Sequence, residues 1–109
     1  MMLAKYSRTV GARGRMERRI VAALLDHLQA AGFHIEGVDD GEDFTVVSTT
    51  KDAMELIFNL DDARVRVGGH HVALVLGEGE DILSDWSYSK SDADGFNAAM
   101  EAFDVDGAK

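Results

Sequence analysis

The sequence contains no cysteine and no apolar run near the length of a membrane-spanning helix. Without cysteine the chain forms no disulfide and offers no thiolate to a metal ion, which favours a reducing compartment. A membrane helix needs about 20 consecutive apolar residues, and the apolar runs here are much shorter. The basic residues near the N-terminus are not followed by the apolar region of a secretory signal. We therefore expect a cytoplasmic protein that does not insert into a membrane.

The sequence also lacks the short motifs that mark common enzyme classes. No serine stands in a Gly-x-Ser-x-Gly turn, so the nucleophile arrangement of the α/β-hydrolases is missing. No glycine-rich run matches a P-loop or a dinucleotide-binding fingerprint. Asp81 and Asp85 could act as paired carboxylates, but acidic residues are so frequent that such pairs arise by chance. We expect no enzymatic activity, no catalytic residue and no cofactor.

Two patterns invite a metal interpretation, and neither supports it. Residues 90–101 overlap an EF-hand calcium loop when Gly95 takes its sixth position, yet Lys90 occupies the first position, which is normally an aspartate ligand. His70 and His71 are adjacent, and adjacent side chains of an extended segment point to opposite faces. We expect a capped acidic helix start in the first case, solvated turn histidines in the second, and no bound metal.

The length and the charge distribution indicate one domain with a basic start. The chain has 109 residues, of which 46% are hydrophobic, and this suits a single globular domain. Residues 1–19 contain six basic residues and one acidic residue, a net charge of +5. The other ninety residues contain five basic and nineteen acidic residues, a net charge of −14. We divide the chain into a flexible basic arm, residues 1–12, and a single α+β domain, residues 13–109. The arm either folds back on the acidic body or marks an interaction surface.

The longest element that we expect is an amphipathic helix over residues 13–32, ended by Gly32. Its apolar residues recur at the three-to-four spacing of a buried stripe: Met16, Ile20, Val21, Leu24, Leu25 and Leu28. Arg15, Arg18 and Arg19 fall on the opposite side, in the first turns, where positive charge opposes the helix dipole. They need an acidic neighbour or an anionic partner, so they form a candidate second contact.

The remaining chain predicts strands, turns and shorter helices. Strand patterns cover residues 33–36, 44–48, 63–67, 72–76 and 82–88, and an Asp-Gly turn joins the first two. The run at 72–76 is nearly all apolar, which predicts a strand covered on both faces. The arginines at 64 and 66 alternate with apolar residues and should face solvent.

Two segments near helices carry separate expectations. Residues 53–59 fit a short helix capped by the preceding threonines, although residues 54, 56, 58 and 60 also alternate as in a strand. A final helix is expected over residues 94–103, and the last six residues should be frayed. The element order α-β-β-α-β-β-β-α, with short connections, predicts antiparallel pairing. The predicted fold is α+β, a twisted antiparallel sheet of four or five strands with the long N-terminal helix and the C-terminal helix packed on one face.

Acidic residues gather in the predicted turns, and they are Asp39, Asp40, Glu42, Asp43, Asp61, Asp62, Glu78, Glu80 and Asp81. If these turns share one end of the sheet, their negative field would steer a basic partner; otherwise they serve solubility. Trp86 and Tyr88 alternate along one strand and are either core residues or an aromatic anchor of an interface. The candidate protein-binding residues are therefore Asp39, Asp40, Glu42, Asp43, Trp86 and Tyr88.

The segment Asp81-Ile82-Leu83-Ser84-Asp85-Trp86-Ser87, followed by Asp94 and Phe96, resembles part of small proteins of bacteriophages and integrated bacterial elements. The resemblance covers residues 72–103, about a third of the chain. It implies a genomic setting whose small acidic proteins include inhibitors of host defence, among them anti-CRISPR proteins. It assigns no role to any residue.

We interpret the chain as a non-enzymatic module that binds a protein with a basic surface, as a mobile-element inhibitor of a host nucleic-acid-handling or defence system. One alternative is a chaperone or immunity protein for a toxin or secreted effector. Small acidic α+β proteins resembling type III secretion chaperones have a comparable element order and are dimers, so a homodimer stays open. Another alternative is nucleic-acid binding through the basic arm, with affinity that falls steeply with salt. The charge of −14 on the body opposes it, so we do not expect nucleic acid as the partner.

Overall fold

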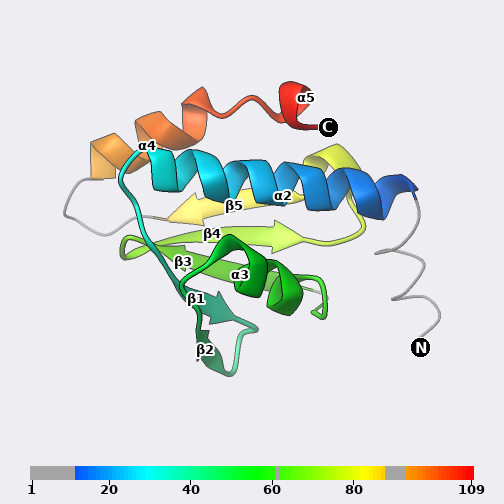
Figure 1. Cartoon of the computed structure of the whole chain (residues 1–109), viewed down its shortest axis with the longest axis horizontal. Coiled ribbons are helices and arrows are strands. Elements are labelled where there is room, and N and C mark those ends of the chain that lie inside the picture. Colours follow the sequence, from blue (N-terminus) through cyan, green and yellow to red (C-terminus); the bar gives the residue numbers. More distant parts are fainter. Residues whose placement is uncertain (1–11, 61, 88–92) are drawn as a thin grey trace.

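The computed structural model describes residues 12–60, 62–87 and 93–109. In chain order the elements are α2 (Ala12–Ala30), β1 (Ile35–Asp39), β2 (Phe44–Val46), α3 (Thr50–Ile57), β3 (Asp62–Val67), β4 (His70–Val75), the 3-10 turn η1 (Gly79–Asp81), β5 (Leu83–Ser87), α4 (Ala93–Ala102) and α5 (Val105–Ala108). The fold is α+β, as the sequence predicts (Figure 1). Residues 1–11 of the predicted arm lie outside the described residues. Among the described helices, none is both long and apolar enough to cross a membrane.

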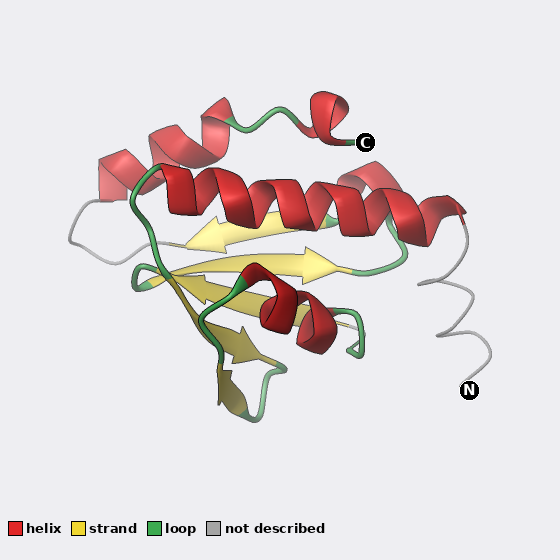
Figure 2. Cartoon of the chain, viewed as in Figure 1, coloured by secondary structure: helices red, strands yellow, loops and turns green. Residues whose placement is uncertain are grey.

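The five strands form one open antiparallel sheet in the order β2-β1-β3-β4-β5. Helices α2, α3 and α4 pack on one face of this sheet, as expected for the N-terminal and C-terminal helices (Figure 2). The core fills the space between the two layers. Its fully buried side chains include Leu24 and Leu25 of α2, Val65 of β3, Leu74 of β4 and Phe96 of α4.

Helix α2 buries the stripe that its spacing predicts. The side chains of Ile20, Val21, Leu24, Leu25 and Leu28 are each at most 1% exposed. The helix stops before Gly32, which has a φ of +99°, a conformation that only glycine adopts without steric cost. The sequence-based prediction of this element is confirmed.

Residues 53–59, for which the sequence allowed either a helix or a strand, lie mostly in helix α3. Thr49 caps the helix, because its hydroxyl oxygen accepts a hydrogen bond from the backbone N–H of Asp52 at 3.1 Å. Ala53 and Ile57, four residues apart, are fully buried against the sheet and α2. The helical spacing therefore prevails over the alternation with period two.

Strand β4 differs from its prediction. The sequence predicts that this strand is covered on both faces, but its burial alternates between buried and half-buried residues. Val72 and Leu74 face the helices, whereas His71, Ala73 and Val75 lie on the face that no described helix covers. An apolar run does not distinguish a doubly covered strand from a half-buried one, since exposed apolar side chains on an antiparallel sheet cost little.

The C-terminal residues also differ from their prediction. The segment expected to be frayed forms the short helix α5 after Asp104. Val105 and Ala108 are half-buried and pack against the core, where α5 contacts α2. Their spacing of three residues places both on one side of the helical turn. This weak apolar pattern was hidden by the acidic and small residues around it.

One buried acidic side chain, which the sequence did not predict to be buried, joins α2 to the β4–β5 connection. Glu17 of α2 is 0% exposed. Its Oε2 accepts hydrogen bonds from the backbone N–H groups of Gly77 at 2.9 Å and Gly79 at 2.6 Å. Its Oε1 is buried and has no hydrogen-bond partner among the residues that the structure describes. Both glycines have positive φ, so the β4–β5 connection turns two N–H groups toward one carboxylate oxygen.

Candidate protein-binding surface at the acidic end of the sheet

The connections that carry most of the acidic residues meet at one end of the sheet. Because β1 is antiparallel to β3, and β3 to β4, the end of β1, the start of β3 and the end of β4 coincide. The β1–β2 turn and the β4–β5 connection therefore lie at the same end (Figure 1). The exposed acidic side chains in these two connections are Asp40, Glu42, Asp43, Glu78 and Asp81. In the described part of these turns, the acidic residues therefore share one end of the sheet, which is the arrangement that would produce a concentrated negative field.

The β1–β2 turn is held in shape by its own carboxylates. Asp39 accepts a hydrogen bond from the N–H of Gly41 at 2.6 Å. Asp40 accepts from the N–H groups of Glu42 at 2.9 Å and Asp43 at 2.7 Å. These bonds favour the charged carboxylate, so the N–H of Asp43, followed by that of Glu42, holds the pKa of Asp40 below its ordinary value. The turn keeps its negative charge while its backbone is fixed.

Two apolar side chains stand directly beside this turn. Phe44 is 42% exposed and Val46 is 77% exposed on the edge strand β2. The ring of Phe44 lies across Gly37, where an added Cβ would collide with the ring and with the carbonyl oxygen of Thr45. The guanidinium carbon of Arg66 lies 5.2 Å from the ring centre on the same face. Phe44 is therefore exposed, but its contacts with Gly37 and Arg66 hold its ring in a defined position. The strand pattern at residues 44–48 predicts the strand but not the exposure of Phe44.

Comparison with known proteins adds no assignment to this geometry. No protein-family model, no curated protein and no solved structure matches the chain. The role of the hairpin is therefore inferred from its own shape and charge.

The three arginines of the predicted second contact lie near the acidic end. Arg15, Arg18 and Arg19 are exposed on the first turns of α2. Glu17, on the buried side of the same turns, binds the β4–β5 connection, so the start of α2 lies at the same end of the sheet as that connection. Arg18 also covers the ring of Phe58, with its guanidinium carbon 4.6 Å from the ring centre.

Trp86 belongs to the helical side of β5. Its side chain is half-buried against the core, and its indole N–H donates to Oδ1 of Asn97 on α4 at 3.1 Å. Asn97 in turn donates to Glu101 at 3.2 Å. This packing favours a structural role over that of an exposed anchor. Tyr88, the other aromatic candidate, lies outside the described residues.

The prediction of two solvated turn histidines is wrong, because both residues belong to β4 and their side chains point to opposite faces of the sheet. His70 is 1% exposed and stacks on Phe96 with a centroid distance of 4.2 Å, while His71 lies on the opposite face. Within the described ranges, no group of three or more histidine, aspartate or glutamate side chains could hold a metal ion. Of the candidate calcium loop, Lys90 and Asp92 lie outside the described residues, and residues 93–101 are helical.

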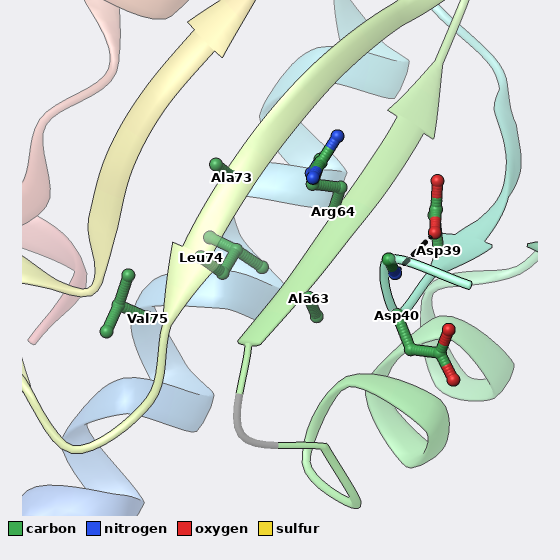
Figure 3. Close-up of a pocket in the computed structure, with 8 residues that line it drawn as sticks. Asp39, Asp40, Ala63, Arg64, Ala73, Leu74 and Val75 are labelled. Atoms are coloured by element: carbon green, nitrogen blue, oxygen red, sulfur yellow. Dashed lines mark hydrogen bonds between the residues drawn. The ribbon is translucent and has the colours of Figure 1, made fainter. Parts of the chain in front are cut away.

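The uncovered face of the sheet continues from the acidic turn. A hollow of about 320 Å³ on this face is lined by Asp39, Asp40, Gly41, Ala63, Arg64, Ala73, Leu74 and Val75 (Figure 3). Asp39 and Arg64 project from neighbouring strands at its edge. Asp39 and Arg64 place one carboxylate and one guanidinium at this edge, so the hollow offers polar contacts of both signs.

A second carboxylate on this face fixes the β3–β4 turn. Glu36 accepts from the N–H of Gly69 at 2.6 Å and from Nε of Arg66 at 3.2 Å. The N–H of Gly69, and after it Arg66, lowers the pKa of Glu36 below its ordinary value of 4.5. The stabilisation from the charged carboxylate is present above that ordinary value and is lost as the pH falls through the lower folded value.

We therefore expect the stability cost of Glu36→Gln to shrink with acid. Near pH 7 the variant should be less stable than the wild type by up to about 1 kcal/mol, since the pair is partly exposed. At an acidic pH below the lowered folded pKa of Glu36, the difference should approach zero, because the wild-type side chain is then also neutral. Urea unfolding at both pH values measures the gap, with Glu55→Gln on the surface of α3 as the control. A gap that stays constant with pH would contradict this assignment.

Proposed function

We propose that the chain is a non-enzymatic protein-binding module that recognises a basic surface of a partner through the β1–β2 hairpin. The carrying observation is the position of Phe44 and Val46, the two large hydrophobic side chains that are exposed among the described residues. They lie on an edge strand directly after a turn that bears Asp40, Glu42 and Asp43. An apolar centre bordered by charged residues is typical of protein interfaces.

The two parts of the hairpin support different stages of binding. The acidic end of the sheet supplies a field that attracts a basic partner and raises the association rate. Phe44 supplies the anchor, because a buried aromatic side chain contributes much of the energy at an interface. Gly37 and Arg66 already position the ring, and Asp39 and Asp40 fix the turn, so little conformational entropy is lost on binding.

Within this proposal we favour a partner from a host nucleic-acid-handling or defence system. Proteins that bind nucleic acid carry basic patches, and an acidic module fits such a patch. The alternative of a toxin or effector chaperone uses the same surface with a different partner. Nucleic-acid binding through the basic arm does not involve the hairpin at all.

The experiment is affinity capture from a bacterial lysate with and without nuclease, read by mass spectrometry, with variants of the hairpin compared in parallel. We expect one protein to survive nuclease treatment and to be captured at least about tenfold less by Phe44→Ala, a change typical of an interface anchor. The double variant Glu42→Gln with Asp43→Asn should also lose most of the capture, since it removes charge but keeps the carboxylates that fix the turn. Asp94→Asn with Glu101→Gln on α4 removes the same charge elsewhere and is the control.

The outcomes separate the hypotheses. Capture by the hairpin variants at the wild-type level would overturn the proposal. Recovery that disappears with nuclease would instead assign the function to the basic arm. The identity of a captured protein decides between a nucleic-acid-handling system and a toxin or effector.

A further inference from the structure

On the uncovered face of the sheet, one row of side chains crosses all five strands. The strand register aligns Phe44 on β2, Asp39 on β1, Arg64 on β3, Ala73 on β4 and Asp85 on β5. After Phe44 the charges along the row are negative, positive, neutral and negative. These residues come from distant parts of the chain, so the row exists only in the folded protein.

Two opposite charges of this row have no ionic partner within the described chain. Arg64 and Asp85 are both exposed, and neither forms an ion pair with a described residue. Asp85 accepts one hydrogen bond, from the backbone N–H of Trp86 at 2.8 Å. Between the two charges, Ala73 leaves a hollow of about 90 Å³ that both side chains line. They are therefore held apart by the strand between them and remain available to another molecule.

The positions of these charges are symmetric about β4. Neighbouring strands lie about 4.8 Å apart, so Arg64 and Asp85 stand one strand spacing to either side of Ala73. A two-fold axis along β4, between two facing sheets, exchanges these positions. Arg64 of one copy then lies over Asp85 of the second copy, and symmetry forms the same pair again. The small side chain of Ala73 on the axis allows the two sheets to approach closely.

We propose that two copies of this chain associate face to face through β3, β4 and β5, held by two reciprocal Arg64–Asp85 ion pairs. His71 and Val75, the other outward side chains of β4, lie along the axis and meet their own copies. Strands β1 and β2 lie beyond the overlap, so the acidic hairpins stay accessible at the two far ends of the dimer. This inference goes beyond the proposed function and does not depend on it.

The size of the contact sets the expected affinity. Three strands and their outward residues cover an area of roughly 15 by 15 Å, well below the ~800 Å² per partner of a standard stable interface. The net charge of −9 on each copy also opposes association at long range. We expect a weak dimer with a dissociation constant on the order of 0.1–1 mM.

Sedimentation equilibrium of the full chain over roughly 1–500 µM, in about 0.15 M salt, measures this association. Arg64→Asp places two carboxylates in each pair, and Asp85→Arg places two guanidinium groups there. Each single variant should raise the dissociation constant at least about tenfold. An equimolar mixture of the two variants should associate as tightly as the wild type, because the heterodimer has opposite charges in both pairs.

Matched controls change the same charges on the helical layer. Lys51→Asp and Glu55→Arg on α3 are exposed and lie on the other side of the sheet, so both should associate like the wild type. Circular dichroism verifies that each variant is folded. The chain that carries both Arg64→Asp and Asp85→Arg restores both pairs in a homodimer and serves if a single variant does not fold.

Three results would overturn the proposal. The first is a wild-type chain that stays monomeric across the whole concentration range. The second is self-association of both single variants at the wild-type level. The third is a mixture that associates no more tightly than the single variants. The measurement contains no partner protein, so any of these results leaves the proposed function of the hairpin standing.

Discussion

Replacing Glu17 with alanine should destabilise the fold by about 3 kcal/mol, the expected cost of leaving buried donors without an acceptor. The substitution removes a fully buried carboxylate that accepts two backbone N–H groups, those of Gly77 and Gly79. It also leaves a cavity between α2 and the β4–β5 connection. Loss of the buried oxygen that lacks a partner offsets part of the cost. Urea unfolding monitored by circular dichroism measures the change in the free energy of unfolding.

Two further variants separate the hydrogen bonds from the burial of charge. Glu17→Gln keeps an oxygen that accepts both N–H groups and should cost about 1 kcal/mol, the worth of ordinary neutral hydrogen bonds. Arg19→Ala, an exposed change on the same helix, should alter stability by no more than about 0.5 kcal/mol. A Glu17→Ala protein as stable as Arg19→Ala would show that the β4–β5 connection holds its shape without the carboxylate.

Glu17 also shows how far the sequence carries the prediction of this fold. It lies three and four residues before Ile20 and Val21, which places it on the buried stripe of α2. The spacing therefore already placed Glu17 on the buried side of α2. A charged residue on such a stripe is buried only when the fold supplies partners, and these partners lie 60 and 62 residues away. Local periodicity predicts the face of a helix but not the distant loop that meets it.

The difference between local patterns and distant contacts also explains which other features of the fold the sequence predicted. Gly32, the cap at Thr49 and the Asp-Gly turn are local, and each was predicted correctly. The α+β class followed from the order of these elements. The uncovered face of β4 was not predicted, because coverage depends on how many helical layers the chain can supply. The helix α5 was missed because two small apolar side chains are a weak pattern.

Some residues of the candidate surface were likewise predicted from local sequence, whereas others depend on how distant strands pair. Asp40 and Asp43 were identified from the turn sequence alone, and the structure places them beside exposed side chains. The exposure of Phe44 depends on its position on the edge strand, which strand order alone determines. The pairing of Ala73 with Arg64 and with Asp85 depends on register and on an irregularity between β4 and β5. Register between distant strands is set by packing, so no local pattern predicts this row.

Replacing Phe96 with alanine should cost about 3–5 kcal/mol, the usual cost of truncating a buried phenylalanine. Phe96 is 0% exposed at the start of α4. Its ring stacks on His70 at 4.2 Å and meets the edge of Phe33 at 5.3 Å, so one truncation removes both aromatic contacts. These contacts attach α4 to the sheet and to the loop after α2. Urea unfolding should therefore show a large loss of stability.

Phe44→Ala is the matched comparison, since it makes the same chemical change on the surface. With 42% of Phe44 exposed, it should cost less than about 1 kcal/mol of stability. The two variants should then separate folding from binding. Phe96→Ala lowers the free energy of unfolding, but its folded molecules keep the hairpin intact, whereas Phe44→Ala keeps stability and loses capture of the partner. Equal stability losses from the two substitutions would contradict the burial on which this separation depends. Equal capture at saturating folded concentrations would remove Phe44 from the binding surface.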